Sequence, residues 1–501
     1  MRQRLRASLE GLGRWQGRGV AAFSGALAAL ALPPFDLWPL LFPALALVCA
    51  LVATAPDAKA AAWRAWFAGA GWFGVATHWI VQPFFVDATT HGWMAPFAIV
   101  LMAGGLALFW AAAGGAAALL CPPHGSRAIV FAGLVTLVEA ARGRVLSGLP
   151  WAQPGHGLIG TEALALSSLG GPLSLTLLTV LIAALSGALV LTRYPLLSVV
   201  PLIVGVSVAM VPWTGPLPAP LAPTIRVVQI NAPQHLKWEP DMIPVFFDRG
   251  LSLTAEGSQP DLVIWPETSL PTILRSSEEA RARIALAADG AEVLIGGQRY
   301  AGVEPRNVLV HLDADGAVVQ VYDKHHLVPF GEYMPLRGLA DDLGLAGLAQ
   351  QLSGGYRPGE GPAVMDLGPF GRAFPMICYE AIFPHYIERV DRPDWLVQVT
   401  NDAWFGSFAM PYQHLALAQL RAAEQGLPLI RAANTGISAV IDAHGQIIEA
   451  LPMDVDGVID AQLPAALPPT LYARFGHLPV ILLAVFVTGA GIAWPRFRKA
   501  H

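Results

Sequence analysis

Three reactive side chains each follow a short apolar segment that is typical of a β-strand: Glu267, Lys324 and Cys378. A carboxylate at the end of an apolar strand is partly desolvated, which raises its affinity for a proton and suits a general base. A lysine held beside a nucleophile lowers the pKa of that nucleophile and stabilises an oxyanion. Taken singly, an exposed turn glutamate and a solvated surface lysine are the commoner cases at such positions.

Cys378 precedes a helix-like segment that begins near Glu380. A thiol at a helix N-terminus gains thiolate character from the helix dipole, so this position predicts a reactive nucleophile. A single cysteine is otherwise most often a buried core residue. The other two cysteines, Cys49 and Cys121, lie in apolar runs, and the wide spacing of all three indicates neither a disulfide framework nor a zinc site.

Two further features near these positions carry polar side chains. The adjacent His325 and His326 invite a metal interpretation, but adjacent residues on a strand point in opposite directions and no third ligand is evident. We therefore expect neither a metal nor a cofactor. Asn401 and Trp404 belong to the turn 400–406, which is interpreted either as a pocket wall or as an ordinary structural turn.

The elements that must position these residues have an α/β pattern between residues 222 and 475. About 250 residues are enough for one domain with a full core. Turn residues at 313–316 and 443–445 predict two hairpins, and Ser276 with Glu279 forms a possible capping box. The predicted strands are 225–230, 262–265, 293–297, 308–312, 318–322, 372–377, 395–400 and 437–442, and the predicted helices are 241–255, 277–289 and 411–425.

The rest of the chain is apolar. Of the 501 residues, 54% are hydrophobic and 13% are charged, against about 25% charged in an ordinary soluble domain. A membrane helix needs roughly 20 apolar residues. Seven such stretches precede residue 214 and an eighth follows the α/β region, at 19–33, 37–54, 62–86, 93–121, 128–149, 163–191, 195–212 and 477–495. The predicted organisation is a membrane domain at 1–213, a catalytic domain at 222–475, a last span at 477–495 and a tail at 496–501.

Charge predicts orientation and excludes one class of partner. Lys and Arg gather before the first span, in alternate connections and after the last span, which favours a cytoplasmic location for those segments and the opposite side for the α/β domain. Glu139, Arg142 and Arg144 depart from this pattern, either because they pair or snorkel, or because they have a function. The first apolar segment imitates a signal peptide, but we expect a retained helix. The net charge of −5 shows no basic footprint for nucleic acid.

Three motifs together resemble the Glu-Lys-Cys triad of the nitrilase superfamily. They are Trp-Pro-Glu-Thr at Glu267, Lys324 followed by His-His-Leu-Val-Pro-Phe-Gly-Glu, and Ile-Cys-Tyr-Glu at Cys378. With seven spans before this domain and one after it, the whole chain is similar to the bacterial apolipoprotein N-acyltransferases.

This resemblance implies an αββα sandwich on the periplasmic face of the inner membrane. It implies transfer of an acyl chain from a membrane phospholipid, through a cysteine thioester, to the N-terminal amine of a diacylglyceryl-cysteine apolipoprotein. By resemblance, Glu267, Lys324 and Cys378 are catalytic, and Glu332, Tyr379 and Glu380 support them. The same resemblance suggests substrate-binding roles for Trp238, Asn307, Asn401 and Trp404, and a pocket or gating role for the segment 339–355.

Three alternatives stay open on the sequence alone. In a membrane-tethered nitrilase-type amidase or lipid hydrolase, water rather than an amine would resolve the acyl-enzyme. The second alternative is a transporter or binding protein with a vestigial extracytoplasmic domain. The apolar stretches contain few charged residues for a transport pathway. The leucines between 339 and 352 predict either a mobile apolar lid that dips toward the membrane or a packed helix of the domain.

Overall fold

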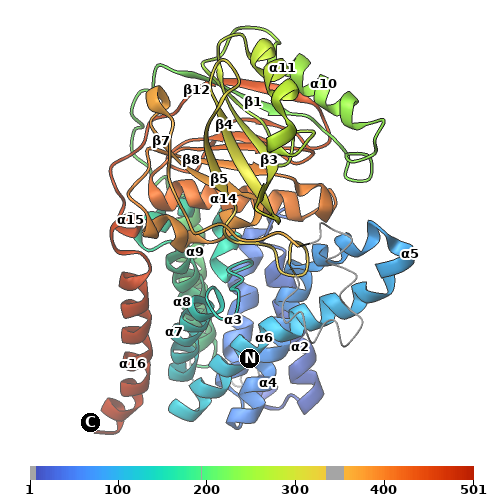
Figure 1. Cartoon of the computed structure of the whole chain (residues 1–501). Coiled ribbons are helices and arrows are strands. Elements are labelled where there is room, and N and C mark those ends of the chain that lie inside the picture. The colour runs from blue at the N-terminus through green and yellow to red at the C-terminus, as the bar shows by residue number, and fades with distance from the viewer. Residues whose placement is uncertain (1–6, 124, 193, 334–354, 501) are drawn as a thin grey trace. The chain divides into compact units, whose positions relative to one another are not determined.

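The computed structural model describes residues 7–123, 125–192, 194–333 and 355–500 (Figure 1). The chain divides into two compact units. A helical unit comprises Met1–Phe85, Gly92–Gly215 and Thr470–His501, and an α/β unit comprises Val86–His91 and Pro216–Pro469. Each unit is described by itself below.

Each of the eight predicted apolar stretches contains a helix. The long helices of this unit are α2 (Arg14–Ala29), α3 (Leu41–Ala53), α4 (Ala58–Ala76), α6 (Ala95–Leu120), α7 (Gly125–Arg142), α8 (Pro172–Val190), α9 (Val199–Met210) and α16 (Leu478–Ala500). Three stretches are clearly shorter in α-helical form than predicted. The third ends as an α-helix at Ala76. The fifth ends as a helix at Arg142, and the sixth begins at Pro172, because proline suits the first turn of a helix and glycines precede it.

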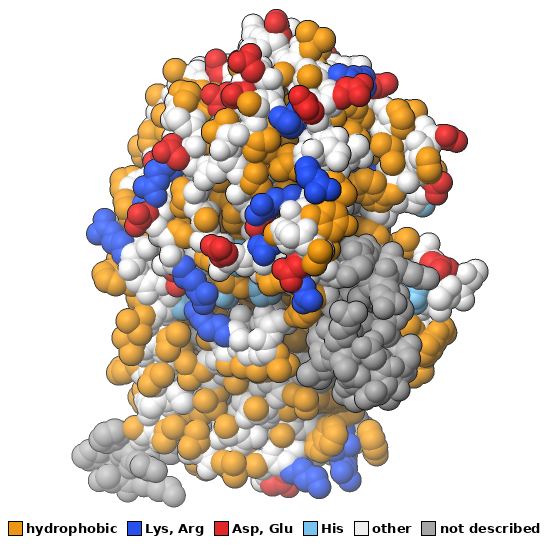
Figure 2. Space-filling view, in the orientation of Figure 1, with side chains coloured by type: hydrophobic (Ala, Val, Ile, Leu, Met, Phe, Trp, Pro, Cys, Tyr) orange, Lys and Arg blue, Asp and Glu red, His pale blue; other side chains and the backbone are white. Residues whose placement is uncertain are grey.

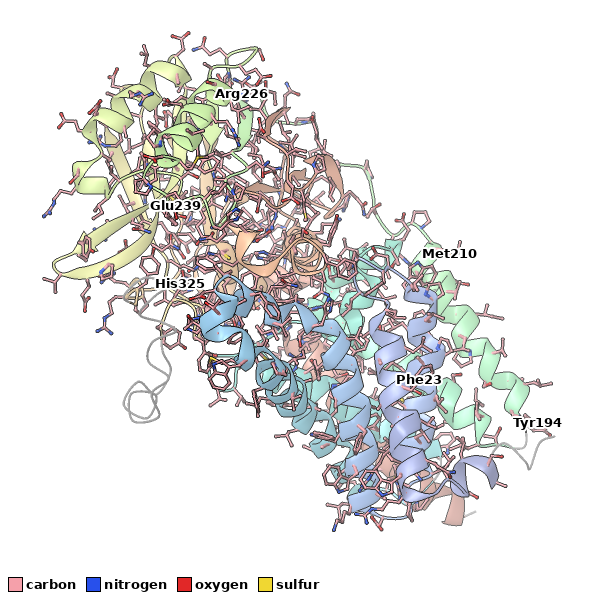
Figure 3. The ribbon with its side chains drawn as sticks, turned by 90° about the vertical axis from the view of Figure 1, so that its right-hand side faces the viewer. Phe23, Tyr194, Met210, Arg226, Glu239 and His325 are labelled. Carbon is pink, nitrogen blue, oxygen red and sulfur yellow. The ribbon has the colours of Figure 1, made fainter. Side chains whose placement is uncertain are left out.

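Within the described residues, two helical segments are long and apolar enough to cross a membrane by length and composition, Ala88–Leu120 and Pro172–Val190. Three shorter apolar helices are Trp38–Ala53, Pro195–Met210 and Leu478–Trp494. Hydrophobic side chains are spread over the visible face of this unit (Figure 2). Phe23 on α2 and Met210 on α9, both labelled in Figure 3, are 68% and 65% exposed. Such a surface fits lipid better than water.

Small residues let the first helix pack closely within the bundle. A Cβ on Gly25 of α2 would lie 1.9 Å from the carbonyl oxygen of Ala68, and one on Gly71 of α4 would lie 2.0 Å from that of Ala22. The backbones of α2 and α4 are therefore in direct contact. This packing makes α2 an integral part of the helical unit.

The charged residues of the fifth apolar stretch have two different environments. Glu139 and Arg142 form a buried ion pair, and Trp110 Nε1 donates to Glu139 Oε1 over 2.8 Å. The Arg142 guanidinium also lies 4.9 Å from the centre of the Phe73 ring. Arg144 is exposed. Pairing, the first of the two alternatives, therefore accounts for Glu139 and Arg142 in this structure.

The α/β unit contains two six-stranded sheets. The first has the order β12-β1-β2-β3-β4-β5 and the second has the order β11-β10-β9-β8-β7-β6. The strands are β1 (Thr224–Gln229), β2 (Leu262–Ile264), β3 (Glu292–Ala301), β4 (Glu304–Leu312), β5 (Val318–Asp323), β6 (Met365–Asp366), β7 (Arg372–Ile377), β8 (Trp395–Thr400), β9 (Leu429–Ala433), β10 (Ser438–Ile441), β11 (Ile447–Leu451) and β12 (Gly457–Gln462). In the first sheet β1, β2 and β3 are parallel, and in the second β7, β8 and β9 are parallel.

Helices cover the outer faces of the two sheets. One hydrophobic cluster joins side chains of both sheets, including Val227 of β1 and Val397 of β8, so the sheets pack face to face. A second cluster joins the other face of the first sheet to α10 (Ile243–Thr254) and α11 (Glu278–Ala288). The helix α14 (Met410–Gln425) contacts the second sheet at β9. The predicted αββα sandwich is confirmed, and its layers are visible in Figure 1.

The sequence-based assignment of elements was incomplete in three ways. The eight predicted strands and both predicted hairpins are present, but β6, β9, β11 and β12 were not predicted. The strands β3 and β4 also extend to a third turn at Gly302, which has a φ of +65°. The predicted capping box is wrong: Ser277 is the N-cap residue of α11, and its hydroxyl donates to the carbonyl of Leu274 rather than capping the helix.

Candidate active site

Strand ends bring Glu267, Lys324 and Cys378 to one buried site. Glu267 follows β2 and Lys324 follows β5, both in the first sheet, whereas Cys378 follows β7 in the second. The three residues are 6%, 1% and 7% exposed. Lys324 Nζ lies 3.6 Å from Glu267 Oε1, and both charges act on the pKa of Cys378. The two sheets therefore each contribute part of the site.

Two neighbouring groups fix the Glu267 carboxylate. Asn307 Nδ2 donates to Oε1 over 2.7 Å, and the backbone N–H of Asn401 donates to Oε2 over 2.8 Å. The predicted substrate-binding residues Asn307 and Asn401 thus contact the carboxylate directly. Asn401 acts through its backbone, because its side-chain amide instead donates to Gln234 and accepts from Asn434.

Lys324 is held as an ammonium group by two carboxylates. Its Nζ donates to Glu332 Oε1 over 2.8 Å, and Glu332 Oε2 accepts from the backbone N–H of Val328. Burial lowers the pKa of Lys324, but the charges of Glu332 and Glu267 outweigh this effect and raise it well above its ordinary value. The predicted supporting residue Glu332 therefore keeps Lys324 charged at neutral pH.

Cys378 differs from expectation in its ionisation. Burial raises the pKa of its thiol well above the ordinary value, and Glu267 raises it further, whereas Lys324 and a hydrogen bond from Thr400 lower it. The prediction of thiolate character from a helix dipole is therefore wrong. The following helix, Cys378–Ile382, is a single short 3-10 turn, whose dipole is too small to offset burial. The resting group is a thiol, so attack on a substrate requires a proton acceptor.

The backbone at Cys378 adopts a left-handed conformation with a φ of +51°. A non-glycine residue in this region costs of order 1–3 kcal/mol and needs support from its surroundings. Glu380 supplies part of that support. Its Oε2 accepts from the backbone N–H of Ile377 over 2.8 Å, and its Oε1 accepts from the backbone N–H groups of His325 and His326. Glu380 thus ties the nucleophile turn to the segment that carries Lys324.

The adjacent histidines have structural contacts in the same region. His325 is labelled in Figure 3. Its Nδ1 atom lies 2.7 Å from the Tyr322 hydroxyl oxygen and 2.7 Å from Glu380 Oε1. His326 Nδ1 contacts the Tyr386 hydroxyl, and its ring stacks on Phe383. In the part of the chain that the structure describes, no cluster of three or more His, Cys, Asp or Glu is suited to a metal ion.

Among the described residues, three of the other predicted site residues form no hydrogen bond to Glu267, Lys324 or Cys378. Tyr379 is half-buried, and burial raises its pKa well above the ordinary value. Trp404 is half-buried in the turn after β8, and Trp238 is 42% exposed. The predicted lid or gating segment at 339–355 lies, apart from Gly355, outside the described residues.

One residue at the site was missed by the sequence analysis. Lys237 is 7% exposed, and its Nζ donates to the carbonyl oxygen of Glu267 over 3.1 Å and to the Thr268 hydroxyl over 3.0 Å. Burial lowers its pKa to about 8, although the Glu267 charge opposes this shift. It also lies 5.6 Å from the centre of the Trp238 ring, which connects that exposed indole to the backbone of Glu267.

Comparisons with known proteins match both units. A family model described as the apolipoprotein N-acyltransferase N-terminal domain matches residues 24–185, and a carbon-nitrogen hydrolase model matches residues 225–468. The chain is 38% identical to an apolipoprotein N-acyltransferase of Rhodopseudomonas palustris over 94% of each chain. It is 38% identical to one of Caulobacter vibrioides, over 97% of this chain and 96% of that one. Among solved structures, an amidase from Nesterenkonia sp. aligns at 18% identity and a TM-score of 0.38, covering 53% of this chain and 97% of that one.

Proposed function

Since the chain belongs to the apolipoprotein N-acyltransferase family, we propose that it transfers an acyl chain from a membrane phospholipid to the N-terminal amine of a diacylglyceryl-cysteine apolipoprotein. The chain is an N-acyltransferase with a carbon-nitrogen hydrolase domain. The observation that carries the assignment of residues is the buried thiol of Cys378 beside the paired charges of Glu267 and Lys324.

In the first half-reaction, Glu267 accepts the proton of Cys378 as the sulfur attacks the ester carbonyl carbon of a phospholipid. The raised pKa of Cys378 makes this base necessary, because little thiolate exists at neutral pH. The Lys324 ammonium and a backbone N–H stabilise the oxyanion that forms. When the tetrahedral intermediate collapses, the C–O bond breaks, the lysophospholipid oxygen takes the proton from Glu267, and a thioester remains.

In the second half-reaction, the α-amine of the apolipoprotein attacks the thioester carbonyl. Glu267 accepts a proton from the amine, Lys324 again stabilises the oxyanion, and the C–S bond breaks. The leaving sulfur regains its proton from Glu267, and the acyl chain is now an amide. In each half-reaction Glu267 passes the proton that it accepts on to the leaving group. It is therefore ready to accept another proton, and the same three side chains can serve both half-reactions.

The location follows from the substrates and the apolar helices. Membrane lipid supplies the donor, and the acceptor carries its own lipid anchor, so both substrates reside in the bilayer. We place the catalytic domain on the periplasmic face of the bacterial inner membrane, with eight spans, because of the distribution of Lys and Arg. Tethering the nucleophile to the membrane reduces a three-dimensional search for such substrates.

A hydrolase is the alternative that a direct assay must separate from a transferase. The purified chain is given phospholipid with a labelled acyl chain and a peptide that begins with diacylglyceryl-cysteine. We expect the label on the peptide amine, and no such product from the Cys378→Ala variant. Release of the label only as free fatty acid would show that water resolves the thioester.

A further inference from the structure

Lys237 is a buried lysine at the candidate site, and the mechanism above makes no use of it. It lies in the segment between β1 and α10 and is 7% exposed. Within the described residues, both acceptors of its ammonium group are uncharged oxygens, the carbonyl oxygen of Glu267 at 3.1 Å and the Thr268 hydroxyl at 3.0 Å. A buried ammonium group that is held by uncharged oxygens is costly to desolvate, so its position requires a reason.

The two acceptors belong to the turn that presents the Glu267 carboxylate. Thr268 has a left-handed backbone with a φ of +49°. For a β-branched residue this conformation costs of order 1–3 kcal/mol and persists only where the surroundings hold it. The Glu267 carbonyl and the Thr268 hydroxyl lie on opposite sides of the N–Cα bond of Thr268. Binding both of them to one ammonium group therefore restrains rotation about that bond.

The first sheet holds the two ends of the same turn. The backbone N–H of Gly296 in β3 donates to the Pro266 carbonyl over 3.2 Å, and the Gly296 carbonyl accepts from the N–H of Ser269 over 2.8 Å. The Glu267 carbonyl lies between these two anchored positions and accepts from Lys237. Lys237 therefore anchors the middle of a turn whose ends are anchored by the sheet.

The segment that carries Lys237 also reaches the carboxylate of Glu267. Gln234 Oε1 accepts from Asn401 Nδ2 over 2.8 Å, and the backbone N–H of Asn401 donates to Glu267 Oε2 over 2.8 Å. Three residues after Gln234, Lys237 contacts the backbone of the same glutamate. One segment is thus connected to the backbone of Glu267 directly and to its carboxylate through Asn401.

We propose that Lys237 is a positioning residue that holds the Glu267 carboxylate in place for proton transfer. This inference rests on the proposed role of Glu267 as the base. The ammonium group can bind both oxygens only while the turn keeps its left-handed conformation, so these bonds offset the strain at Thr268. Burial lowers the pKa of Lys237 to about 8. The group is therefore still mostly an ammonium at pH 7, with enough hydrogens for both acceptors.

The test measures the burst of p-nitrophenol that the purified full chain releases from p-nitrophenyl butyrate at pH 7, after subtraction of the release by Cys378→Ala. Lys237→Met is expected to lower the maximal burst rate roughly 10- to 100-fold, up to the loss that a misplacement of about 1 Å produces. The half-saturating ester concentration is expected to stay unchanged, because Lys237 does not touch the ester.

A double-mutant cycle separates positioning of Glu267 from a general effect on the fold. In the Glu267→Ala background, Lys237→Met is expected to cause no further loss, since the carboxylate that it positions is absent. The activated ester keeps the residual rate of this background measurable. A loss by the same factor with and without the Glu267 carboxylate would overturn the proposal, and so would a folded Lys237→Met variant with a normal rate.

A second variant and a matched control complete the set. Thr268→Val keeps the shape of the side chain, removes one acceptor of Lys237 and is expected to lower the rate about 3-fold, the scale of one hydrogen bond. If Lys237→Met does not fold, a normal rate for Thr268→Val would overturn the proposal. The control, Arg281→Met, removes a cation that donates to the Gly316 carbonyl between β4 and β5, and a normal burst is expected.

The experiment also distinguishes a failure of this inference from a failure of the proposed function. A normal burst for Glu267→Ala alone would overturn the role of Glu267 as the base, and with it the role of Lys237. The ester contains neither phospholipid nor lipoprotein. A failure of the unmodified chain to transfer acyl groups to a lipoprotein would therefore leave the comparison of these variants intact.

Discussion

At the scale of single residues, burial keeps Cys378 protonated until a substrate arrives, and the charge of Glu267 adds to this effect. Two carboxylates, Glu267 and Glu332, pair with the ammonium of Lys324. A thiolate would add another charge in a buried place, which explains the raised pKa of the thiol. In the proposed mechanism, the Lys324 ammonium and a backbone N–H stabilise the oxyanion of the tetrahedral intermediate.

Removing that ammonium is expected to slow acylation strongly. For Lys324→Ala we predict a fall in the rate of acyl-enzyme formation on the order of 10² to 10³, the scale of one lost oxyanion donor. The rate is measured by intact-mass spectrometry after mixing with phospholipid. Lys59→Ala, which changes an exposed lysine of the helical unit, serves as the control and should leave the rate unchanged. A near-normal rate for Lys324→Ala would make Lys324 structural.

The sequence was sufficient to select three residues that meet in one buried site, but not their ionisation. Glu267, Lys324 and Cys378 could be predicted because each follows an apolar strand and carries a recognisable motif. The direction of the Cys378 pKa shift could not be predicted, since it depends on burial between two sheets that are far apart in sequence. Lys237 was missed for the same reason: its partner, the carbonyl of Glu267, is 30 residues away.

At the scale of elements, a close approach of two strands positions the proposed base. Gly296 of β3 lies against the backbone that carries Glu267. A Cβ at this glycine would lie 2.5 Å from the Glu267 Cα and 2.5 Å from the Pro266 carbonyl oxygen. Since both are backbone atoms, the clash can be relieved only if the end of the strand moves. The neighbouring Gly297 has room, because its nearest contacts are Leu270 side-chain atoms at 3.4 Å.

These two glycines make a matched pair for mutation. Gly296→Ala is expected to displace Glu267 and to lower the rate of acyl-enzyme formation by about 10²-fold, the loss that a misplacement of roughly 1 Å produces. Gly297→Ala is expected to retain a rate close to that of the unmodified chain. Both rates are measured in the phospholipid assay alongside the melting temperature. Equal effects of the two variants would contradict the positional role of Gly296.

Elements with clear periodicity were predictable, and elements defined by their neighbours were not. The helix α14 was predicted from its apolar spacing. Its buried His414 could not be singled out from the sequence, because the neighbouring buried positions are mostly alanine and leucine. The strand β9 is only five residues long and is buried along its whole length, so it shows no alternation. The edge strand β12 pairs with a distant partner, because it closes the first sheet beside β1 from the far end of the domain.

At the scale of the whole molecule, the chain combines a helical unit with many exposed apolar side chains and an α/β unit whose visible face carries more of the charged ones (Figure 2). Each unit could be recognised from composition alone. The number of membrane crossings could not be recognised in the same way. Three apolar helices of the unit have fewer residues than a helix needs to cross a bilayer. Their packing through glycine and alanine is a property of the folded bundle.

The proposed orientation predicts which sites a membrane-impermeant maleimide can reach. Ser258 in the α/β unit and Lys59 in the helical unit are both exposed, and the native cysteines are buried. In intact spheroplasts, the Ser258→Cys variant is expected to be labelled, and the Lys59→Cys variant only after permeabilisation. The unmodified chain controls for labelling of native thiols. The opposite pattern would place the catalytic domain in the cytoplasm.

The most direct test of the central claim is to trap the acyl group and map it. The purified chain is exposed to phospholipid without an acceptor peptide, digested and analysed for the modified residue. We predict one fatty acyl group, attached as a thioester to Cys378 and released by hydroxylamine, with no adduct on the Cys378→Ala variant. An acyl adduct on that variant, or an adduct mapped to Cys49, Cys121 or another side chain, would contradict the mechanism.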